Sequence, residues 1–302
     1  MSQTYRLAVI QDGDKRVPSV ERDGRIIPLA KLLGDSASDL PEEGDLMPIL
    51  EDWSRWSSAI EQKLPDAAAL FAAGQDAESV KFAPPIGLPG KLVCIGANYH
   101  DHINEMPIPM VPKYPYSFIK PGNNTVCGSK DPVFAPRHVK MMDYEAELAV
   151  VIGRPCANVE AADALDYVAG YMNFNDLSAR DWIESRPPIG VDWVMHKGFD
   201  NFAPTGPYLL PARFVSDPQD MAMKLTVNGE VRQNSSTAQM VYGVADCIAH
   251  LSSVMTMMPG DVIGTGTPAG VAHGHGGRAY IKAGDEIRLT IAGLGELVTP
   301  VI

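Results

Sequence analysis

The run at 142–153, Met-Asp-Tyr-Glu-Ala-Glu-Leu-Ala-Val-Val-Ile-Gly, constrains the fold most, because its apolar second half predicts a β-strand. Side chains of a strand alternate between its two faces, so Glu145 and Glu147 point the same way. The apolar residues at the following even positions point to the opposite face, which we therefore expect to be buried. Two neighbouring carboxylates repel each other and lose hydration in a buried strand, and a shared cation would relieve both effects.

A second apolar run, at 167–174, ends in Asn175 and Asp176, and Asp176 offers a third carboxylate. Three hard oxygen ligands without a nearby cysteine favour Mg²⁺, Mn²⁺ or Ca²⁺ over zinc. The alternative is that Glu145 and Glu147 line the solvent-exposed face of an edge strand, where alternating charged residues are common. The glutamate pair by itself leaves both interpretations open.

The composition argues against several classes of partner and location. Lys and Arg total 25 and Asp and Glu total 37, so the formal net charge of −12 disfavours nucleic acid and anionic membranes as partners. No apolar run approaches the roughly 18 residues of a transmembrane helix, and the first residues lack the apolar region of a signal peptide. The four cysteines have no Cys-x-x-Cys spacing, which favours free thiols in a reducing cytoplasm. We therefore expect a cytoplasmic protein that binds a small molecule.

The sequence predicts two domains. Short strands at 4–10 and 15–20 precede the hairpin signal Asp23-Gly24, and helical patterns follow at 29–34 and 46–73. A Pro- and Gly-rich stretch then reads as a linker. We predict a small N-terminal α+β domain at 1–85 and a main domain at 86–302.

The main domain alternates short strands with Gly and Pro, which predicts an α+β, mostly β fold of the roll or sandwich type. Two helical patterns interrupt the strands, at about 158–165 and 237–258. The expected strands are 91–95, 116–119, 133–135, 145–152, 167–174, 206–210, 222–228, 261–264 and 286–292.

A candidate general base lies in the segment 96–106, which follows an apolar strand. If the chain turns into a helix after Asn98, His102 and Glu105 are three residues apart and share one face. A carboxylate beside a histidine orients the ring and favours its protonated form, which suits general base catalysis. The alternatives are a surface His–Glu pair without a function, or a metal pair formed by His100 and His102.

Three further segments carry chemistry. Arg180 follows Asp176 by four residues and could bind a substrate carboxylate with its guanidinium fork, or pair with Asp176 or Asp181. Lys197 lies in a Gly- and aromatic-rich loop, where the alternative is an ordinary solvated lysine. The stretch 259–271 is a strand that runs into a Gly/Thr loop, whose N–H and hydroxyl groups can bind an anion. The His/Gly segment that follows, at 273–277, is expected to be a loop rather than a metal site.

These motifs, in this order, resemble the fumarylacetoacetate hydrolase family from about residue 91 to residue 302. The motifs are Gly-x-Asn-Tyr-x-x-His-x-x-Glu at 96–105, Lys-Pro at 120–121, Asp-x-Glu-x-Glu-Leu at 143–148, Asn-Asp-x-Ser-Ala-Arg-Asp at 175–181, Lys-Gly-Phe-Asp at 197–200, Asn-Gly-Glu-Val-Arg-Gln at 228–233 and Pro-Gly-Asp-x-Ile-x-Thr-Gly-Thr-Pro at 259–268.

The resemblance implies a mixed β-sandwich roll that forms a homodimer and holds a divalent cation, Mg²⁺ or Mn²⁺. It also implies a His–Glu dyad on a lid segment. The Pro-rich insert at 185–193 departs from the family pattern, since it is longer than in compact bacterial members, and leaves the shape of the pocket and the size of the substrate open. By this resemblance the metal ligands are Glu145, Glu147 and Asp176, the catalytic residues are His102, Glu105 and Lys197, and the substrate-binding residues are Arg180, Lys120, Thr267 and Tyr99.

The implied activity is metal-dependent hydrolysis of a C–C bond in a 1,3-dicarbonyl or acylpyruvate-type 2-oxo acid. The cation would stabilise an enolate as a Lewis acid, and the His–Glu dyad would activate a water. A decarboxylase, isomerase or lyase that acts on an oxaloacetate-like acid through the same enolate is the alternative, because the metal ligands are common to all of them. A catalytically silent ligand-binding protein with this fold is a further alternative.

Overall fold

The N-terminal segment folds into a small lobe of strands and helices. The computed structural model describes residues 4–106, 109–274 and 279–302, so the predicted His/Gly loop lies partly outside the described residues. The expected turn at Asp23-Gly24 is confirmed, with positive φ at both residues, as a tight hairpin requires. The elements of this lobe are β1 (Arg6–Asp12), β2 (Lys15–Arg22), β3 (Arg25–Pro28), α1 (Leu29–Leu33), α2 (Met47–Glu51), α3 (Trp53–Lys63), α4 (Ala68–Ala72), β4 (Gln75–Asp76) and β5 (Lys81–Ala83).

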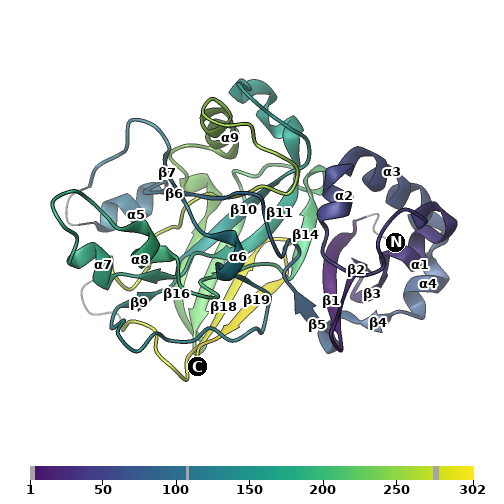
Figure 1. Ribbon diagram of the computed structural model, residues 1–302, viewed down its shortest axis with the longest axis horizontal. Helices are drawn as coiled ribbons and strands as arrows, with labels where there is room; N and C mark the ends of the chain where they lie inside the picture. The colour runs from purple at the N-terminus through teal and green to yellow at the C-terminus, as the bar shows by residue number, and fades with distance from the viewer. Residues whose placement is uncertain (1–3, 107–108, 275–278) are drawn as a thin grey trace.

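One large sheet runs through the whole molecule, and it joins the N-terminal lobe to the rest (Figure 1). The junction is the antiparallel pairing of β1 with β14, in register Leu7↔Leu209. Along its main path the strand order is β4-β3-β2-β1-β14-β11-β10-β17-β6-β7, and β5 pairs with β1. The strands after the lobe are β6 (Leu92–Gly96), β7 (Tyr116–Ile119), β10 (Ala146–Ile152), β11 (Val168–Asn175), β14 (Tyr208–Pro211) and β17 (Val262–Gly264).

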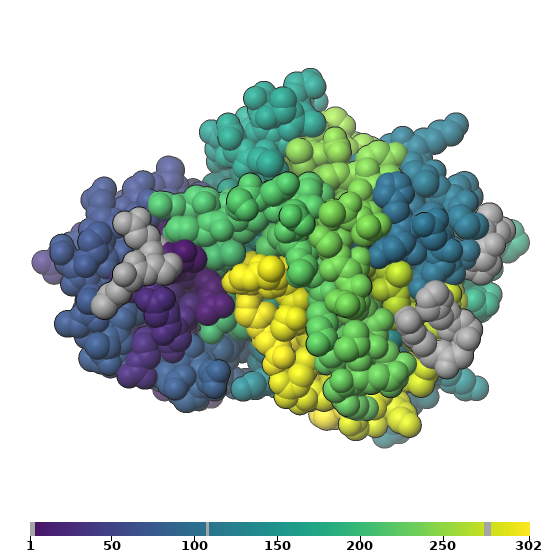
Figure 2. Space-filling view, turned by 180° about the vertical axis from the view of Figure 1, so that it is seen from behind, coloured from purple at the N-terminus to yellow at the C-terminus, as the bar shows by residue number. Residues whose placement is uncertain are grey.

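A second sheet of four strands covers one face of the large sheet. Its order is β16-β15-β18-β19, formed by β15 (Ala222–Val227), β16 (Glu230–Ser236), β18 (Glu286–Ile291) and β19 (Glu296–Pro300). Leu148 and Val150 of β10 share a hydrophobic core with Leu225 and Leu289 of this second sheet. Seen from behind, the yellow C-terminal segment lies next to the purple part of the N-terminal lobe (Figure 2). This arrangement is the mostly β, sandwich-like α+β fold that the sequence predicts.

Strand β10 is buried on both faces, because the lobe covers the face that the second sheet does not. Ala149 and Val151 belong to a second core together with Leu50 and Trp56 of the N-terminal helices. Hydrogen bonds from β11 on one side and β17 on the other make β10 an interior strand. The alternative that the glutamate pair lies on a solvent-exposed edge strand is therefore wrong.

Short elements outside the two sheets carry much of the site. Helices α5 (His100–Glu105), α7 (Asp181–Glu184) and α8 (Trp193–Lys197) gather at the end of the molecule opposite the N-terminal lobe (Figure 1). The short strands β9 (Met142–Asp143) and β12 (Ser178–Ala179) pair with each other beside them. The remaining elements are α6 (Gly122–Thr125), β8 (Val126–Cys127), β13 (Ala203–Pro204) and α9 (Val244–Ser252).

Several expected elements differ from the structure. The helix expected at 237–258 is shorter in the structure, where only α9 forms. A separate 3-10 turn at Thr237–Gln239 precedes it, and α9 starts after Gly243, whose N–H donates to the Asp246 side chain as a helix cap. The segment 133–135 forms a single bridge, since prolines flank it and cannot donate to a ladder. In place of the helix expected at about 158–165, a 3-10 helix spans Ala161–Tyr167. Strands β16 and β19 were not expected.

The domain boundary after residue 85 stays a prediction, although the large sheet is continuous across it. Among the described residues, no helix is long and apolar enough to cross a membrane.

Candidate active site

The three predicted metal ligands meet where β10 begins and β11 ends. Antiparallel pairing sets Ala146 opposite Asn175, and the N–H of Asp176 donates to the carbonyl of Glu145 at 3.0 Å. Each of Glu145, Glu147 and Asp176 offers a carboxylate oxygen within 4.8 Å of the others, and all three side chains are buried. Three converging carboxylates form the hard oxygen donor set that Mg²⁺ and Mn²⁺ take.

Two buried lysines lie against this triad. Lys197 Nζ donates to Glu145 Oε2 at 2.8 Å and to Asp176 Oδ2 at 2.6 Å. Lys120 pairs with Asp176 and donates to two backbone carbonyls. Burial alone would lower the pKa of Lys197, but Asp176 and Glu145 outweigh it and raise that pKa above its usual value. Lys197 is therefore a charged ammonium group, and the alternative of a solvated surface lysine is wrong.

Arg180 uses its guanidinium fork on two carboxylates of the protein. Its Nε donates to Asp143 Oδ2 at 3.0 Å, and its Nη2 donates to Glu145 Oε1 at 2.5 Å. The ion pairs expected between Arg180 and Asp176 or Asp181 are not the ones that form. Burial would raise the pKa of Glu145, but Lys197 and Arg180 hold it below its ordinary range.

Asp143 is a site residue that the sequence reasoning missed. It is fully buried, and besides Arg180 it accepts hydrogen bonds from the N–H groups of Ala272 and His273 at 2.9 and 3.1 Å. Asp143 thereby holds the chain beyond the Gly/Thr loop against the site. Its place as the first acidic residue of the Asp-x-Glu-x-Glu motif was the available signal.

Glu147 is the member of the triad without a cationic partner among the described residues. Its Oε2 accepts the N–H of Gly266 at 3.1 Å, and the Gly/Thr loop comes so close that a Cβ at Gly264 would lie 2.6 Å from that oxygen. Burial, followed by the charges of Asp176 and Glu145, raises the pKa of Glu147 well above its usual value. Burial and the two neighbouring carboxylates therefore favour the protonated form of Glu147 over its charged form.

The buried charges around the triad do not balance. The four carboxylates of Asp143, Glu145, Glu147 and Asp176 face the three cations of Lys120, Arg180 and Lys197. Full ionisation thus leaves one negative charge without a partner, which is unfavourable in a buried site. A divalent cation would reverse the sign of this excess and favour an anionic ligand. The residues present therefore fit a divalent metal.

The His–Glu pair forms as the spacing predicts. His102 and Glu105 lie on α5, and His102 Nδ1 is 2.8 Å from Glu105 Oε1. Glu105 also accepts the N–H of Gly270 at 3.1 Å, which joins α5 to the Gly/Thr loop. His102 is buried, so the alternative of a surface pair is wrong. In the described part of the chain, neither His100 nor His102 belongs to a group of metal-ligating side chains.

Thr267 and Tyr99 occupy different surroundings. Thr267 directly follows Gly266, which binds Glu147, so the loop places it next to the triad along the chain. Tyr99 is fully buried in the core between the sheets, and its hydroxyl donates to Met223 Sδ at 3.3 Å. The substrate-binding role of Tyr99 stays a prediction.

The Pro-rich insert leads into the helix that carries Lys197. Ile189 at its tip is 96% exposed. At its end Trp193 stacks on Phe118 of β7 with ring centroids 4.2 Å apart, which anchors α8 to the large sheet.

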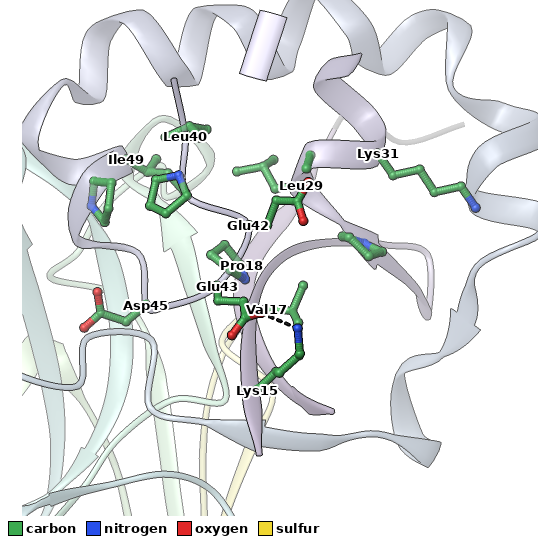
Figure 3. A pocket seen from close by; sticks show the side chains of 14 residues that line it. Lys15, Val17, Pro18, Leu29, Lys31, Leu40, Glu42, Glu43, Asp45 and Ile49 are labelled. Atoms are coloured by element: carbon green, nitrogen blue, oxygen red, sulfur yellow. Dashed lines mark hydrogen bonds and ion pairs between the residues drawn. The ribbon is translucent and has the colours of Figure 1, made fainter. Parts of the chain in front are cut away.

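A separate pocket of about 320 Å³ lies within the N-terminal lobe (Figure 3). Its lining comes from residues between Lys15 and Ile49, and Lys15 pairs with Glu43 at its side. None of the predicted site residues lines this pocket, and it is not the candidate active site.

Comparisons with known proteins find relatives and solved structures that are similar over almost the whole chain. A protein of Burkholderia multivorans with a provisional hydrolase name is 40% identical over 285 residues, which cover 94% of each chain. The crystal structure of maleylpyruvate hydrolase from Sphingobium sp. SYK-6 is 30% identical, covers 98% of this chain and 99% of its own, and has a TM-score of 0.77. The same hydrolase was also solved with a manganese(II) ion and pyruvate.

A solved isomerase is also similar. The 2-hydroxyhepta-2,4-diene-1,7-dioate isomerase from Mycobacterium marinum is 30% identical, with 99% of this chain and 98% of that chain covered and a TM-score of 0.71. The family model "Fumarylacetoacetate (FAA) hydrolase C-terminal" matches residues 91–302. The chain belongs to the fumarylacetoacetate hydrolase family.

Proposed function

We propose that this protein is a divalent-metal-dependent hydrolase that cleaves a C–C bond in an acylpyruvate-type 2-oxo acid or a related 1,3-dicarbonyl compound. The observation that carries the proposal is the buried Glu147 carboxylate without a cationic partner, in a triad beside an oriented His–Glu pair. The similarity to maleylpyruvate hydrolase supports the substrate class.

Glu145, Glu147 and Asp176 would hold Mg²⁺ or Mn²⁺. Bound there, the cation would act as a Lewis acid toward the two oxygens of a 1,3-dicarbonyl group. Lys120 keeps Asp176 in place by pairing with its other oxygen, Oδ1, and leaves Oδ2 toward Lys197 and the triad.

His102 supplies the base. Glu105 accepts the hydrogen of Nδ1, which fixes the tautomer in which Nε2 carries the lone pair. Nε2 would take a proton from a water whose oxygen attacks the carbonyl carbon distal to the 2-oxo acid. The electron pair of the breaking C–C bond passes to the pyruvate half as an enolate, which is then protonated, so the products are a carboxylic acid and pyruvate.

Two buried cations, Lys197 and Arg180, have different roles in the proposed reaction. Both are buried and remain cationic, because neighbouring carboxylates outweigh the effect of burial on the pKa of each. Lys197 is held between Glu145 and Asp176, so its ammonium group lies at the triad, where charge develops. We expect Lys197 to donate to the oxyanion and Arg180 to set the orientation of Glu145.

The test is a turnover screen on purified protein with and without Mn²⁺. The substrates are acetylpyruvate, fumarylpyruvate, oxaloacetate and the neutral diketone 2,4-pentanedione, and NMR identifies the products. Two acid fragments from an acylpyruvate in the presence of Mn²⁺ are the expected result. Pyruvate and carbon dioxide from oxaloacetate alone would replace the hydrolase by a decarboxylase.

The second candidate is an isomerase of a 2-oxo acid, which the similarity to the Mycobacterium marinum enzyme supports. Isomerisation moves a proton within the substrate and needs no attacking water. In D₂O an isomerase would incorporate deuterium into an unsaturated 2-hydroxy diacid without forming fragments. A homodimer, which the family resemblance implies, stays a proposal that analytical ultracentrifugation tests.

A further inference from the structure

Gln233 links three segments of the site through one buried amide. It lies on β16 and is 1% exposed. Its Oε1 accepts the N–H of Ala146 at 2.9 Å, and its Nε2 donates to Thr267 Oγ1 and to the carbonyl of Pro268, both at 2.8 Å. Ala146 is the residue between the two glutamates of the triad, so Gln233 contacts both the metal-binding strand and the Gly/Thr loop.

A strand irregularity aims Gln233 at these partners. In the pairing of β15 with β16, Leu225 faces Gln233 while Thr226 faces Val231, so Arg232 is an extra, unpaired residue. Such a bulge bends its strand and redirects the side chains beside it. Two residues further on, the Ser235 hydroxyl donates to Asp101 at 2.6 Å, so β16 also holds the helix that carries the His–Glu pair.

The direction of the Gln233 amide is not interchangeable. A backbone N–H must meet its oxygen and a backbone carbonyl must meet its nitrogen, so a flipped amide would lose both bonds. Nε2 therefore donates to Thr267, and the Thr267 oxygen acts as acceptor. The hydroxyl hydrogen of Thr267 has no acceptor among the described residues and is left to donate elsewhere.

We infer that Gln233 is a positioning residue that fixes the Thr267 hydroxyl as a hydrogen-bond donor toward a substrate carboxylate. The inference rests on the proposed function, since it concerns an anionic 2-oxo acid at the same site. Gly266 binds Glu147, so Thr267 stands beside the triad. With a divalent cation present the charges favour an anion there. A hydroxyl locked as a donor selects a carboxylate over a neutral carbonyl compound, because hydrogen bonds to charged groups are the stronger ones.

The experiment compares the binding of two probes by calorimetry in saturating Mn²⁺: pyruvate, which has a carboxylate, and 2,4-pentanedione, which has none. Gln233→Met removes the amide at similar size. We expect it to weaken pyruvate binding by about 10- to 100-fold, the loss of one hydrogen bond to a charged group, and to leave 2,4-pentanedione binding near wild type. Thr267→Val should cause the same selective loss of pyruvate binding, whereas Thr267→Ser keeps the hydroxyl and should bind pyruvate nearly as wild type does.

The double variant decides whether Gln233 acts through Thr267. If it does, adding Gln233→Met to Thr267→Val weakens pyruvate binding little further, since the interaction is already gone. Gln219→Met is the matched control. Gln219 is another partly buried amide, which accepts the N–H of Val244 at 2.8 Å and donates to the Thr237 carbonyl at 3.4 Å without contacting Thr267. This control should bind both probes as wild type does.

Each other outcome overturns the inference. Equal losses for both probes in Gln233→Met would mean that Gln233 acts only on the position of the metal-binding strand. An unchanged pyruvate affinity in Thr267→Val would remove the hydroxyl from the site, even if the Gln233 variant failed to fold. A wild type that binds neither probe would overturn the proposed function together with this inference, whereas a wild type that binds both with unaltered variants would overturn the inference alone.

Discussion

Replacing Glu147 by glutamine separates the two roles of this carboxylate. The variant keeps the shape of the side chain and an oxygen for the N–H of Gly266, but it cannot ionise in either the folded or the unfolded chain. In the metal-free protein we therefore expect the variant to be more stable than wild type near neutral pH. In the presence of Mn²⁺ the order should reverse, because the variant has lost a charged ligand.

The size of the effect follows from proton linkage. The pKa of Glu147 is raised in the folded state by burial and by the nearby carboxylates, above its unfolded value of about 4.3. Below that pH both states are protonated and nothing is lost. As the pH rises the unfolded chain loses this proton while the folded chain keeps it, so the free energy of unfolding falls by about 1.4 kcal/mol per pH unit until the folded pKa is reached.

Glutamine has no proton to lose, so the stability difference between variant and wild type should grow with this slope. Urea unfolding in EDTA, from about pH 5 to about pH 7, measures it. Over the same range Mn²⁺ should displace the proton, so wild-type affinity rises up to about tenfold per pH unit and calorimetry in two buffers detects the released proton. Parallel pH profiles for the two proteins, or Mn²⁺ binding without proton release, would refute the reasoning.

Three further changes test other parts of the site. His102→Ala should lower kcat by about 10²- to 10⁴-fold while calorimetric Mn²⁺ affinity is kept, and unchanged turnover would remove His102 from the role of base. Arg180→Met leaves the buried carboxylates of Asp143 and Glu145 without their guanidinium partner. It should reduce the free energy of unfolding of the metal-free protein in urea by about 3–5 kcal/mol, and a loss below about 1 kcal/mol would contradict this prediction. Removal of residues 1–85 uncovers the edge of β14 and should give a fragment that aggregates, as light scattering would show, whereas wild-type stability of that fragment would contradict a packing role for the lobe.

The metal ligands could be predicted from the sequence because the signal is local. Strand alternation alone sets Glu145 and Glu147 on one face, and the end of the next apolar run supplies Asp176. The i,i+3 spacing of His102 and Glu105 is equally local, and the structure confirms their contact.

Partners far apart in sequence could not be predicted in this way. From the sequence, the Arg180 guanidinium group is available for a substrate or for a nearby aspartate such as Asp176. In the structure the pairing of β9 with β12 brings it to Asp143, which lies 37 residues earlier in the chain. Gln233 belongs to a recognisable motif, but its partner Ala146 lies 87 residues away and is reached only after β16 bulges. A sequence pattern predicts that a strand exists, whereas its neighbour depends on the whole topology.

The same limit applies to the N-terminal lobe. Its strands at 4–10 and 15–20 follow from alternation and the Asp-Gly turn, but nothing in them indicates that β1 extends the large sheet through β14. The register Leu7↔Leu209 joins segments from opposite parts of the chain.

That junction has a consequence for natural variation in this protein. Backbone ladders and a shared core cross from the lobe into the catalytic part, so the two unfold together rather than one at a time. A substitution at Trp56 or Leu50 therefore reduces how much active protein a cell retains, through clearance of the unfolded fraction, while each surviving molecule turns over at the normal rate. Such variants would lower the total activity in the cell by lowering the amount of folded protein, and higher expression would restore that activity. Higher expression would not compensate for a substitution in the carboxylate triad.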